Sequence, residues 1–202
     1  MRIGIFREKL RQNLIRLLHF NLNHGFRTHG HLSENEGVAL YKYAKKISIN
    51  GNAIEVGSYV GKSTVFLAMG VQKRDGTLYC VDTFENQDMS EGLRETYLEF
   101  KENTKKFQDL LLVKKGFSND LRIIQTIPDN LDLVFIDASH DDESVRQDIS
   151  NYLPKLRSGG KILFHDYGNT LGVKKPVDDS VSGGHLTIIE IVDSMAICIK
   201  NI

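Results

Sequence analysis

The amino-acid sequence predicts an α/β fold, a doubly wound, mostly parallel seven-stranded sheet that ends in an antiparallel hairpin. Short apolar runs alternate with amphipathic stretches along most of the chain, which is typical of strands that alternate with helices. The last two apolar runs are separated only by Asp193 and Ser194, a spacing typical of a hairpin. One of these two strands should therefore run antiparallel to the rest. The expected strands cover 52–56, 77–82, 110–114, 131–136, 160–165, 186–192 and 195–200.

Amphipathic stretches fill most of the gaps between these strands and are expected to form helices. A separate helix is expected from Ser33 to about Ile47, because Ser33 and Glu36 form the S-x-x-E capping box that opens many helices. The helices between the strands are expected near 62–72, 90–107, 118–126 and 141–157.

Residues 1–32 are predicted to form an amphipathic helix and segment ahead of a ligand-binding domain over 33–202. Leu10, Leu14 and Leu17 fall at helical spacing, and basic residues lie elsewhere on the helix. Such a helix can lie on an anionic membrane as a peripheral contact. The alternative is packing on the domain, or on a partner subunit in a homodimer.

The composition is that of an ordinary globular protein: 202 residues, 41% hydrophobic and 26% charged. Lys+Arg and Asp+Glu both number 26, so no net charge favours nucleic acid as a partner. The chain has no apolar run of transmembrane length and no signal-peptide core, which predicts a cytoplasmic protein. Cys80 and Cys198 lie in apolar runs and are expected to be buried free thiols in a reducing compartment.

The stretch from Glu55 to Ser63, EVGSYVGKS, joins an apolar strand to a helix through a loop that contains glycine. Such loops hold the charged end of a cofactor in α/β proteins, because the N–H groups at the helix start are unpaired. A dinucleotide fingerprint fails here, since Tyr59 and Lys62 occupy two of its glycine positions. A phosphate-binding P-loop is a nearer match through GKS, but Val56 replaces its first glycine.

A third interpretation is a site for S-adenosylmethionine (SAM), whose end at this loop is an amino acid rather than a phosphate. Glu55 could then accept hydrogen bonds from the ammonium group of SAM, whereas it would repel a phosphate. We rank SAM first, a P-loop second and NAD third; a plain glycine turn with a solvated acid is the structural alternative.

Ligands of open α/β sheets bind beyond the carboxyl ends of the strands, so the polar residues at these ends are the candidates for function. Asp82 ends the second strand, where a carboxylate is positioned to accept hydrogen bonds from two ribose hydroxyls. The alternative for a lone Asp is a helix cap or a solvated loop.

Asp137 stands at the end of the fourth strand, and the pair His165-Asp166 at the end of the fifth. If these strands are neighbours, Asp137 and Asp166 converge, and a bound cation would relieve their repulsion. Oxygen ligands favour Mg²⁺, Ca²⁺ or Mn²⁺, whereas His165 as a ligand would admit softer metals. The alternative is that Asp166 caps a turn and His165 is a packed or catalytic imidazole.

His140 and His165 are the best general-base candidates, because imidazole titrates near neutral pH and can take a proton from a hydroxyl.

Four segments of the sequence together resemble one family. They are Ile54–Thr64, Val81–Thr83, Phe135–His140 and Gly159–Tyr167. In this order they resemble the class I SAM-dependent methyltransferases, in particular the group similar to catechol, antibiotic and sugar O-methyltransferases. The resemblance covers about 33–200 and implies a Rossmann-like methyltransferase fold, whose parallel sheet also ends in an antiparallel hairpin.

The resemblance also implies roles for individual residues. In metal-dependent members, the cation is bound by the acid that corresponds to Asp137 and by two successive acidic or amide residues. Here that pair is His165 and Asp166, so the first of the two departs from the usual oxygen ligand. The SAM contacts implied by the resemblance are Glu55, Gly57, Ser63, Asp82 and, near the adenine, Ser118.

The expected function is transfer of a methyl group from SAM to a hydroxyl of a small molecule, such as a sugar or a phenol-like acceptor. The rival functions are a P-loop-like nucleotide hydrolase and a non-catalytic SAM-binding module. The sequence does not identify the acceptor, whose pocket is expected to come from irregular segments such as 1–32, 84–92 and 167–185.

Overall fold

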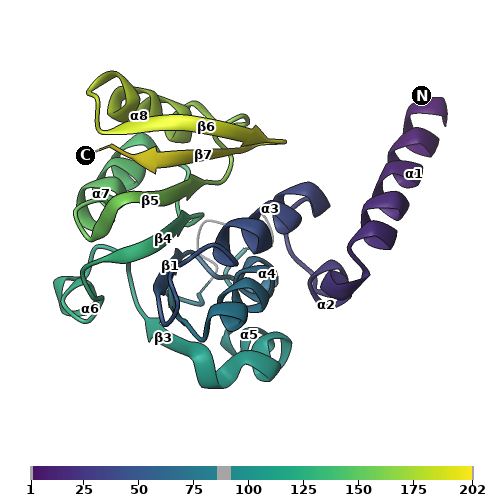
Figure 1. Ribbon diagram of the computed structural model, residues 1–202, viewed down its shortest axis with the longest axis horizontal. Helices are drawn as coiled ribbons and strands as arrows, with labels where there is room; N and C mark the ends of the chain where they lie inside the picture. The colour runs from purple at the N-terminus through teal and green to yellow at the C-terminus, as the bar shows by residue number, and fades with distance from the viewer. Residues whose placement is uncertain (1, 86–91, 202) are drawn as a thin grey trace.

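A computed structural model describes residues 2–85 and 92–201, with side chains from residue 10 onward (Figure 1). It contains a seven-stranded sheet of order β3-β2-β1-β4-β5-β7-β6. Every strand pair is parallel except the two pairs made by β7, which confirms the predicted antiparallel hairpin. The strands are β1 Asn52–Val56, β2 Thr77–Asp82, β3 Leu111–Lys115, β4 Leu131–Ile136, β5 Leu156–Phe164, β6 Leu186–Val192 and β7 Met195–Lys200.

The register of the four central strands brings their carboxyl ends together. Val56, the last residue of β1, pairs with Val81 of β2 and with Ile136 of β4. Ile136 in turn pairs with Phe164 of β5. The residues that follow these strands therefore meet at one edge of the sheet. The strand order reverses between β1 and β4, and this is where open α/β sheets bind ligands.

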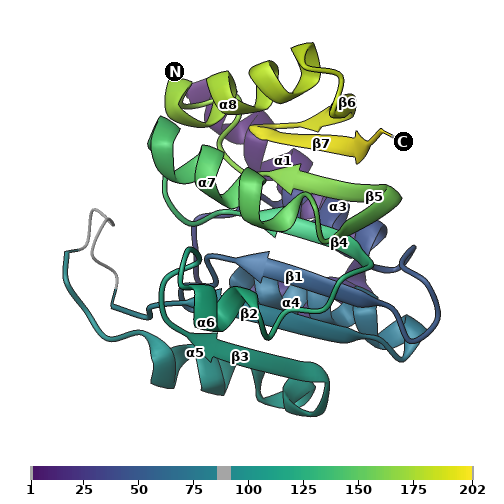
Figure 2. The ribbon, with the colours of Figure 1, turned by 90° about the vertical axis from the view of Figure 1, so that its left-hand side faces the viewer.

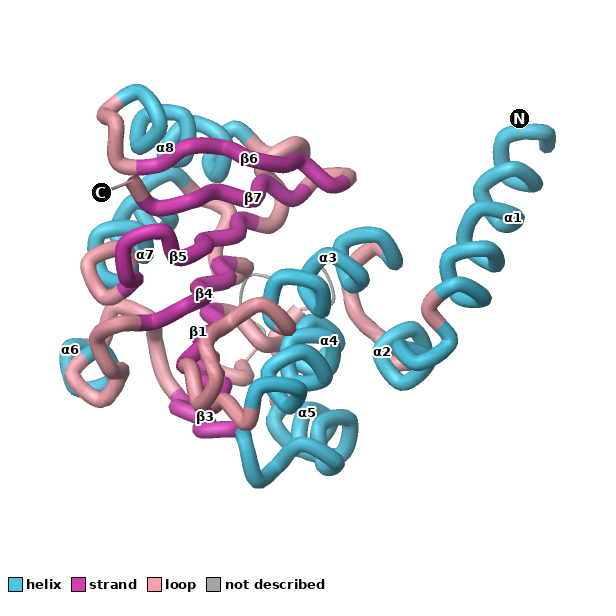
Figure 3. The backbone as a smooth tube through the Cα atoms, viewed as in Figure 1, coloured by secondary structure: helices cyan, strands magenta, loops and turns pink. Residues whose placement is uncertain are grey.

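Helices cover both faces of the sheet (Figure 3). The helices on one face are α3 Glu34–Ala44, α4 Lys62–Val71 and α5 Tyr97–Thr104, and those on the other are α6 Leu121–Ile124, α7 Asp142–Tyr152 and α8 Leu171–Ser182. Each layer has its own buried core, one around Phe66, Phe100 and Phe135, the other around Tyr152 and Phe164. Burial of this apolar surface is the main force that holds the layers together. Short 3₁₀ turns cover Phe20–Leu22, Gln72–Arg74 and Lys105–Leu110.

Three of the predicted helices differ from the observed ones in extent. The helix expected at 90–107 begins at Tyr97; its first two positions lie outside the described residues. The helix expected at 118–126 is reduced to the four residues of α6. The helix expected at 141–157 ends at Tyr152, because Leu156 is already buried in β5.

The expectation that 167–185 is irregular is wrong, because this segment contains α8. Its glycines and Pro176 are typical of loops. The helix forms nevertheless, since the side chain of Thr170 accepts a hydrogen bond from the N–H of Val173 and caps its start. Pro176 and Val177 are buried, and Val177 belongs to the core on this face of the sheet, so packing outweighs the low helix propensity of proline.

The N-terminal helix α1, Arg2–Leu18, projects from the body of the protein in Figure 1 and lies behind the other elements in the view of Figure 2. Arg16 is paired with Glu34 at 2.5 Å, while Leu17 is 72% exposed. Further along, in the 3₁₀ turn and in α2 Asn23–Arg27, Leu22 and Phe26 are buried in the core beside α4. The domain division at residue 32, the membrane contact and the homodimer stay predictions. Among the described helices, none is long and apolar enough to cross a bilayer.

Cys80 and Cys198 are buried free thiols, as predicted.

Candidate active site

A cavity of about 280 Å³ opens at the carboxyl ends of β1, β2, β4 and β5. The segment before α3 contributes Gly30, His31 and Leu32 to its rim. The sequence-predicted residues that line the cavity are Gly57, Ser63, Asp82, Ser118, Asp137, His140, His165 and Asp166.

The bend after β1 requires glycine at its first position. Gly57 has a φ of 90°, in the left-handed region that favours glycine, and its N–H donates to the carbonyl of Val81 at 2.9 Å. A Cβ atom on Gly57 would lie 2.2 Å from the carbonyl oxygen of Asp137. The bend is therefore in close contact with the end of β4, and both belong to one wall of the cavity.

Asp82, the last residue of β2, holds this bend in place. Its Oδ2 accepts hydrogen bonds from the backbone N–H groups of Ser58 at 2.6 Å and Tyr59 at 2.8 Å, and its Oδ1 accepts one from Phe84 at 2.5 Å. A carboxylate oxygen can accept more than one hydrogen bond, so Asp82 can also bind a ligand hydroxyl in the cavity that it lines. Asp82, the residue predicted to bind the ribose, thus also holds the bend in its conformation.

Glu55 is buried outside the cavity lining. Its Oε2 accepts hydrogen bonds from the hydroxyls of Ser58 at 2.7 Å and Thr64 at 2.5 Å, and Oε1 has no hydrogen-bond partner in the described part of the chain. Burial raises the pKa of Glu55 to about 7, although the hydroxyls of Ser63, Thr64 and Ser58 favour the anion. The observed contacts tie the bend to the start of α4, and contact with SAM stays a prediction.

The segment after β3 and helix α7 form another part of the cavity wall. The hydroxyl of Tyr152 donates to the carbonyl of Ser118 at 2.7 Å and fixes this segment. Asp148 of α7 also lines the cavity, although only 2% of it is exposed, and its Oδ1 has no partner among the described residues. Burial raises the pKa of Asp148 to about 6. We did not predict this residue from the sequence, because a single acid in an amphipathic helix is usually solvated.

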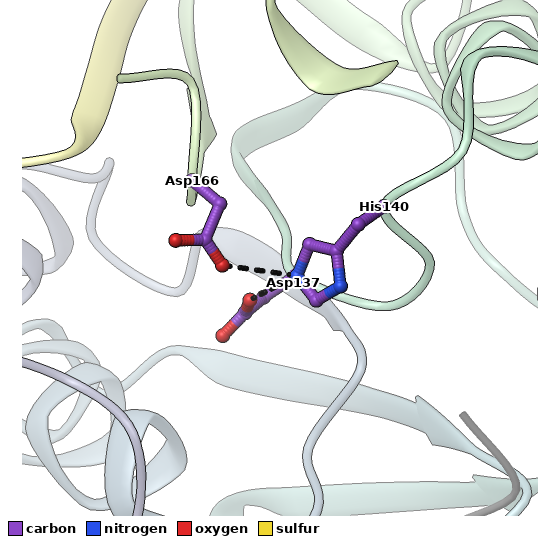
Figure 4. A group of neighbouring side chains, drawn as sticks. All are labelled: Asp137, His140 and Asp166. Carbon is purple, nitrogen blue, oxygen red and sulfur yellow. Dashed lines mark ion pairs between the residues drawn. The ribbon is translucent and has the colours of Figure 1, made fainter. Parts of the chain in front are cut away.

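Two carboxylates and a histidine meet at the ends of β4 and β5 (Figure 4). Nε2 of His140 lies 3.0 Å from Oδ2 of Asp166 and 4.0 Å from Oδ1 of Asp137. The hydrogen bond with Asp166 raises the pKa of His140, against the effect of burial, and hydrogen bonds from His140 and His165 lower the pKa of Asp166. Asn169 also donates to Asp166, at 2.6 Å, which fixes this carboxylate in the site.

His165 packs against the same two carboxylates and is only 6% exposed. Its Nδ1 lies 3.0 Å from Oδ1 of Asp137 and 3.1 Å from Oδ2 of Asp166, and its Nε2 lies 3.3 Å from Oε2 of Glu36. Burial alone would lower the pKa of His165, but the carboxylates of Asp137, Asp166 and Glu36 raise it to about 12. With a carboxylate at each ring nitrogen, His165 is suited to carry a positive charge.

Glu36 reaches this group from the first turn of α3. The predicted capping box is present, since the N–H of Ser33 donates to Oε2 of Glu36 at 2.9 Å and the N–H of Glu36 donates to Oγ of Ser33 at 3.2 Å. The contact with His165 spans 129 residues of sequence, and the capping motif gives no sign of it.

The described residues that could hold a metal ion are Asp137, His140 and Asp166, whose ligand atoms lie within 4.8 Å of one another. The predicted set contained His165 instead of His140. His165 lies as close to both carboxylates, but its side chain is only 6% exposed, whereas that of His140 is 37% exposed. The structure therefore brings together the predicted acids and both histidines, and makes His140 the more accessible candidate ligand.

The strand order with its reversed seventh strand, together with a Gly bend and an acid at the end of β2, defines the class I SAM-dependent methyltransferases. A family model described as a methyltransferase domain matches residues 54–167, which is more than half of the chain. The protein belongs to this methyltransferase family.

Solved structures with the same fold include several O-methyltransferases. The O-methyltransferase NovP aligns with a TM-score of 0.72 at 18% identity, over 86% of this chain and 83% of that one. The O-methyltransferase TomG from Streptomyces achromogenes, in complex with SAM, aligns with a TM-score of 0.65 at 16% identity, over 85% and 82%. An O-methyltransferase from Bacillus cereus in complex with SAH aligns with a TM-score of 0.65 at 18% identity, over 94% and 90%. At these identities the similarity shows the fold.

A curated relative is an uncharacterized protein, R132, from Acanthamoeba polyphaga mimivirus, which is 26% identical over 117 residues. The match covers 56% of this chain and 50% of the relative, so it spans about half the length of that protein.

Proposed function

We propose that this protein transfers the methyl group of SAM to a hydroxyl of a small molecule, such as a sugar or a phenol-like acceptor. The observation that carries the proposal is the pair of His140 and Asp166 in a cavity that also contains Asp82 and the bend at Gly57. The solved O-methyltransferases of the same fold support the choice of oxygen as the methyl acceptor.

SAM would lie along the wall formed by the ends of β1, β2 and β3. Its amino-acid end would rest on the bend at Gly57 and the start of α4, where Ser63 lines the cavity. The ribose hydroxyls would donate to Asp82, and the adenine would lie beside Ser118, with its amino group available to the unpartnered oxygen of Asp148.

His140 is the better placed of the two candidate bases. Both nitrogens of His165 face carboxylates and the residue is nearly inaccessible, whereas the side chain of His140 is 37% exposed. Asp166 accepts the N–H of Nε2, which leaves Nδ1 of His140 to take the proton of the acceptor.

In this reaction the acceptor oxygen attacks the methyl carbon, the carbon–oxygen bond forms and the carbon–sulfur bond breaks. The proton passes to His140, and S-adenosylhomocysteine (SAH) leaves. Asp166 stabilises the imidazolium that forms, and holding the two reactants in line supplies much of the rate gain.

A divalent cation is a second candidate for activating the hydroxyl. Asp137, His140 and Asp166 would hold it, and this donor set of two carboxylates and an imidazole fits Mn²⁺, Zn²⁺ or Fe²⁺ better than Mg²⁺. A bound cation would lower the pKa of the acceptor hydroxyl. His165 already offsets negative charge at Asp137 and Asp166, which reduces the need for a cation.

The proposal is tested by incubating the protein with methyl-labelled SAM and a panel of sugars, phenols and catechols, with and without EDTA. We expect label on at least one acceptor, together with SAH. Turnover that EDTA does not reduce would show that the reaction needs no cation. Binding of SAM without transfer to any acceptor would favour the non-catalytic module.

Membership of the methyltransferase family and the carboxylates of Glu55 and Asp82 at the bend argue against a P-loop hydrolase. Thermal stabilisation by ATP with no response to SAM would nevertheless overturn the SAM proposal.

A further inference from the structure

We propose that Glu36 is a positioning residue for the candidate base His140, in addition to its part in the cap of α3. The inference rests on the proposed function and concerns how its catalytic geometry is set. It arises from the contact between Nε2 of His165 and Oε2 of Glu36, at 3.3 Å, deep in the protein.

Glu36 is itself held rigidly. Its Oε1 accepts hydrogen bonds from the N–H of Ser194 at 3.0 Å and from the hydroxyl of Ser194 at 2.7 Å, in the turn between β6 and β7. Its Oε2 accepts the N–H of Ser33 at 2.9 Å. Only 2% of Glu36 is exposed, so water competes little for these bonds. A helix cap alone requires only the bond to Ser33.

This fixed carboxylate determines the orientation of the His165 ring. An imidazole bound only at Nδ1 could tilt about that bond, whereas a ring bound at both nitrogens has its plane set. Nδ1 of His165 then lies 3.0 Å from Asp137 and 3.1 Å from Asp166. The edge of the ring also packs against Phe135, with ring centroids 6.4 Å apart.

The chain of contacts ends at the base. Oδ2 of Asp166 is shared between Nδ1 of His165 and Nε2 of His140, at 3.1 Å and 3.0 Å. Asn169 holds Asp166 through Oδ1 only, so displacement of His165 would remove one of the two partners of Oδ2. The tautomer and the direction of His140 would change as a result. Glu36 does not contact the acceptor, and it influences the orientation of His140 through His165 and Asp166.

The same residue connects the site to the cavity rim. Gly30, His31 and Leu32 line the cavity and lead directly into the cap at Ser33. Glu36 thus ties the rim segment, the hairpin turn and the candidate base into one hydrogen-bonded unit.

The test compares Glu36→Gln with Ser33→Ala. The Ser33→Ala variant removes the hydroxyl that caps α3 and leaves the carboxylate of Glu36 against His165. Each variant is checked for folding by circular dichroism and for SAH affinity by calorimetry. Turnover is then measured with the acceptor found in the labelled-SAM panel, and the ring ¹⁵N signals of His165 and His140 are recorded by NMR without any acceptor.

For Glu36→Gln we expect kcat to fall about tenfold, as for loss of one charge-assisted hydrogen bond, with KM for SAM within about twofold of wild type. The ring signals of both histidines should shift. Ser33→Ala should lower the melting temperature but leave kcat and the ring signals unchanged.

Unchanged kcat and ring signals in a folded Glu36→Gln variant, or an equal fall in kcat for Ser33→Ala, would overturn the role of Glu36. Absence of turnover in the wild type would count against the proposed function instead. The NMR signals are recorded without an acceptor, so they test the role of Glu36 whether or not the wild type shows turnover. If Glu36→Gln does not fold, Ser194→Ala loosens Glu36 from its other side and should shift the same signals.

Discussion

The cavity has two halves that are built in different ways. At the ends of β1 and β2, the wall is backbone: a glycine bend held by the carboxylate of Asp82 through the N–H groups of Ser58 and Tyr59. At the ends of β4 and β5, the wall is a network of titratable side chains, in which His165 is shared by three acids. We call these the cofactor half and the transfer half.

The difference matches the tasks proposed for the two halves. A cofactor that is the same in every turnover can be bound by fixed backbone and a fixed carboxylate. Proton transfer needs groups that can exchange a proton and keep their geometry. Side chains that are hydrogen-bonded to one another meet both needs. Substitutions in the transfer half should therefore change kcat, and substitutions in the cofactor half should change affinity or stability.

The largest effect should come from the transfer half. Changing His140→Ala removes the candidate base, and kcat should fall about 100-fold or more. The Kd for SAM, measured by calorimetry, should stay within about twofold of wild type. The exposed His185 offers a control, since His185→Ala should leave both quantities unchanged. Full turnover by His140→Ala would show that His140 is not the base and that the transfer half does not determine kcat.

Glu55 gives a test based on stability. Its pKa is raised from 4.5 to about 7 in the folded protein, so the folded state binds the proton more tightly than the unfolded state. This contribution to stability is present below about pH 4.5 and is lost as the pH rises through 7.

Between pH 5 and pH 8, the free energy of unfolding of wild type should therefore fall by on the order of 2 kcal/mol more than that of Glu55→Gln. Urea unfolding at the two pH values measures this difference. Parallel pH dependence in the two proteins would mean that Glu55 is not buried as described.

Asp82 tests the affinity of the cofactor half. Asp82→Ala should weaken SAM binding about tenfold, or about 1.4 kcal/mol, because the ribose loses its acceptor and the bend loses its clamp. Calorimetry measures the change, and Asp109→Ala, at an exposed acid, controls for the loss of charge. An unchanged Kd would argue against the ribose assignment.

The smallest effect concerns Asp148. Oδ1 of Asp148, which has no hydrogen-bond partner among the residues that the structure describes, should accept a hydrogen bond from the amino group of adenine. Wild type should therefore prefer SAH over its inosine analogue, which has an oxygen in place of that group. In Asp148→Asn this preference should shrink about threefold, the value of a modest hydrogen bond. An equal preference in both proteins would show that Asp148 does not bind the amino group of adenine.

The cofactor half could be predicted from the sequence because its parts are local. The Gly bend follows an apolar strand directly, and Asp82 ends the next strand. The convergence of Asp137 and Asp166 also followed from adjacent parallel strands. Glu36 could be predicted only as a cap, since its contact with His165 depends on how α3 packs over the sheet. The sequence predicts Glu55 as a partner of the ammonium group of SAM, whereas its burial against Ser58 and Thr64 depends on the direction of its side chain.

The most direct test of the central claim is a crystal structure with SAH bound. We predict ribose hydroxyls within about 3.2 Å of Asp82, the amino-acid end against the bend at Gly57, and the sulfur atom facing His140. SAH bound elsewhere, or in this cavity with its sulfur turned away from His140, would contradict the account.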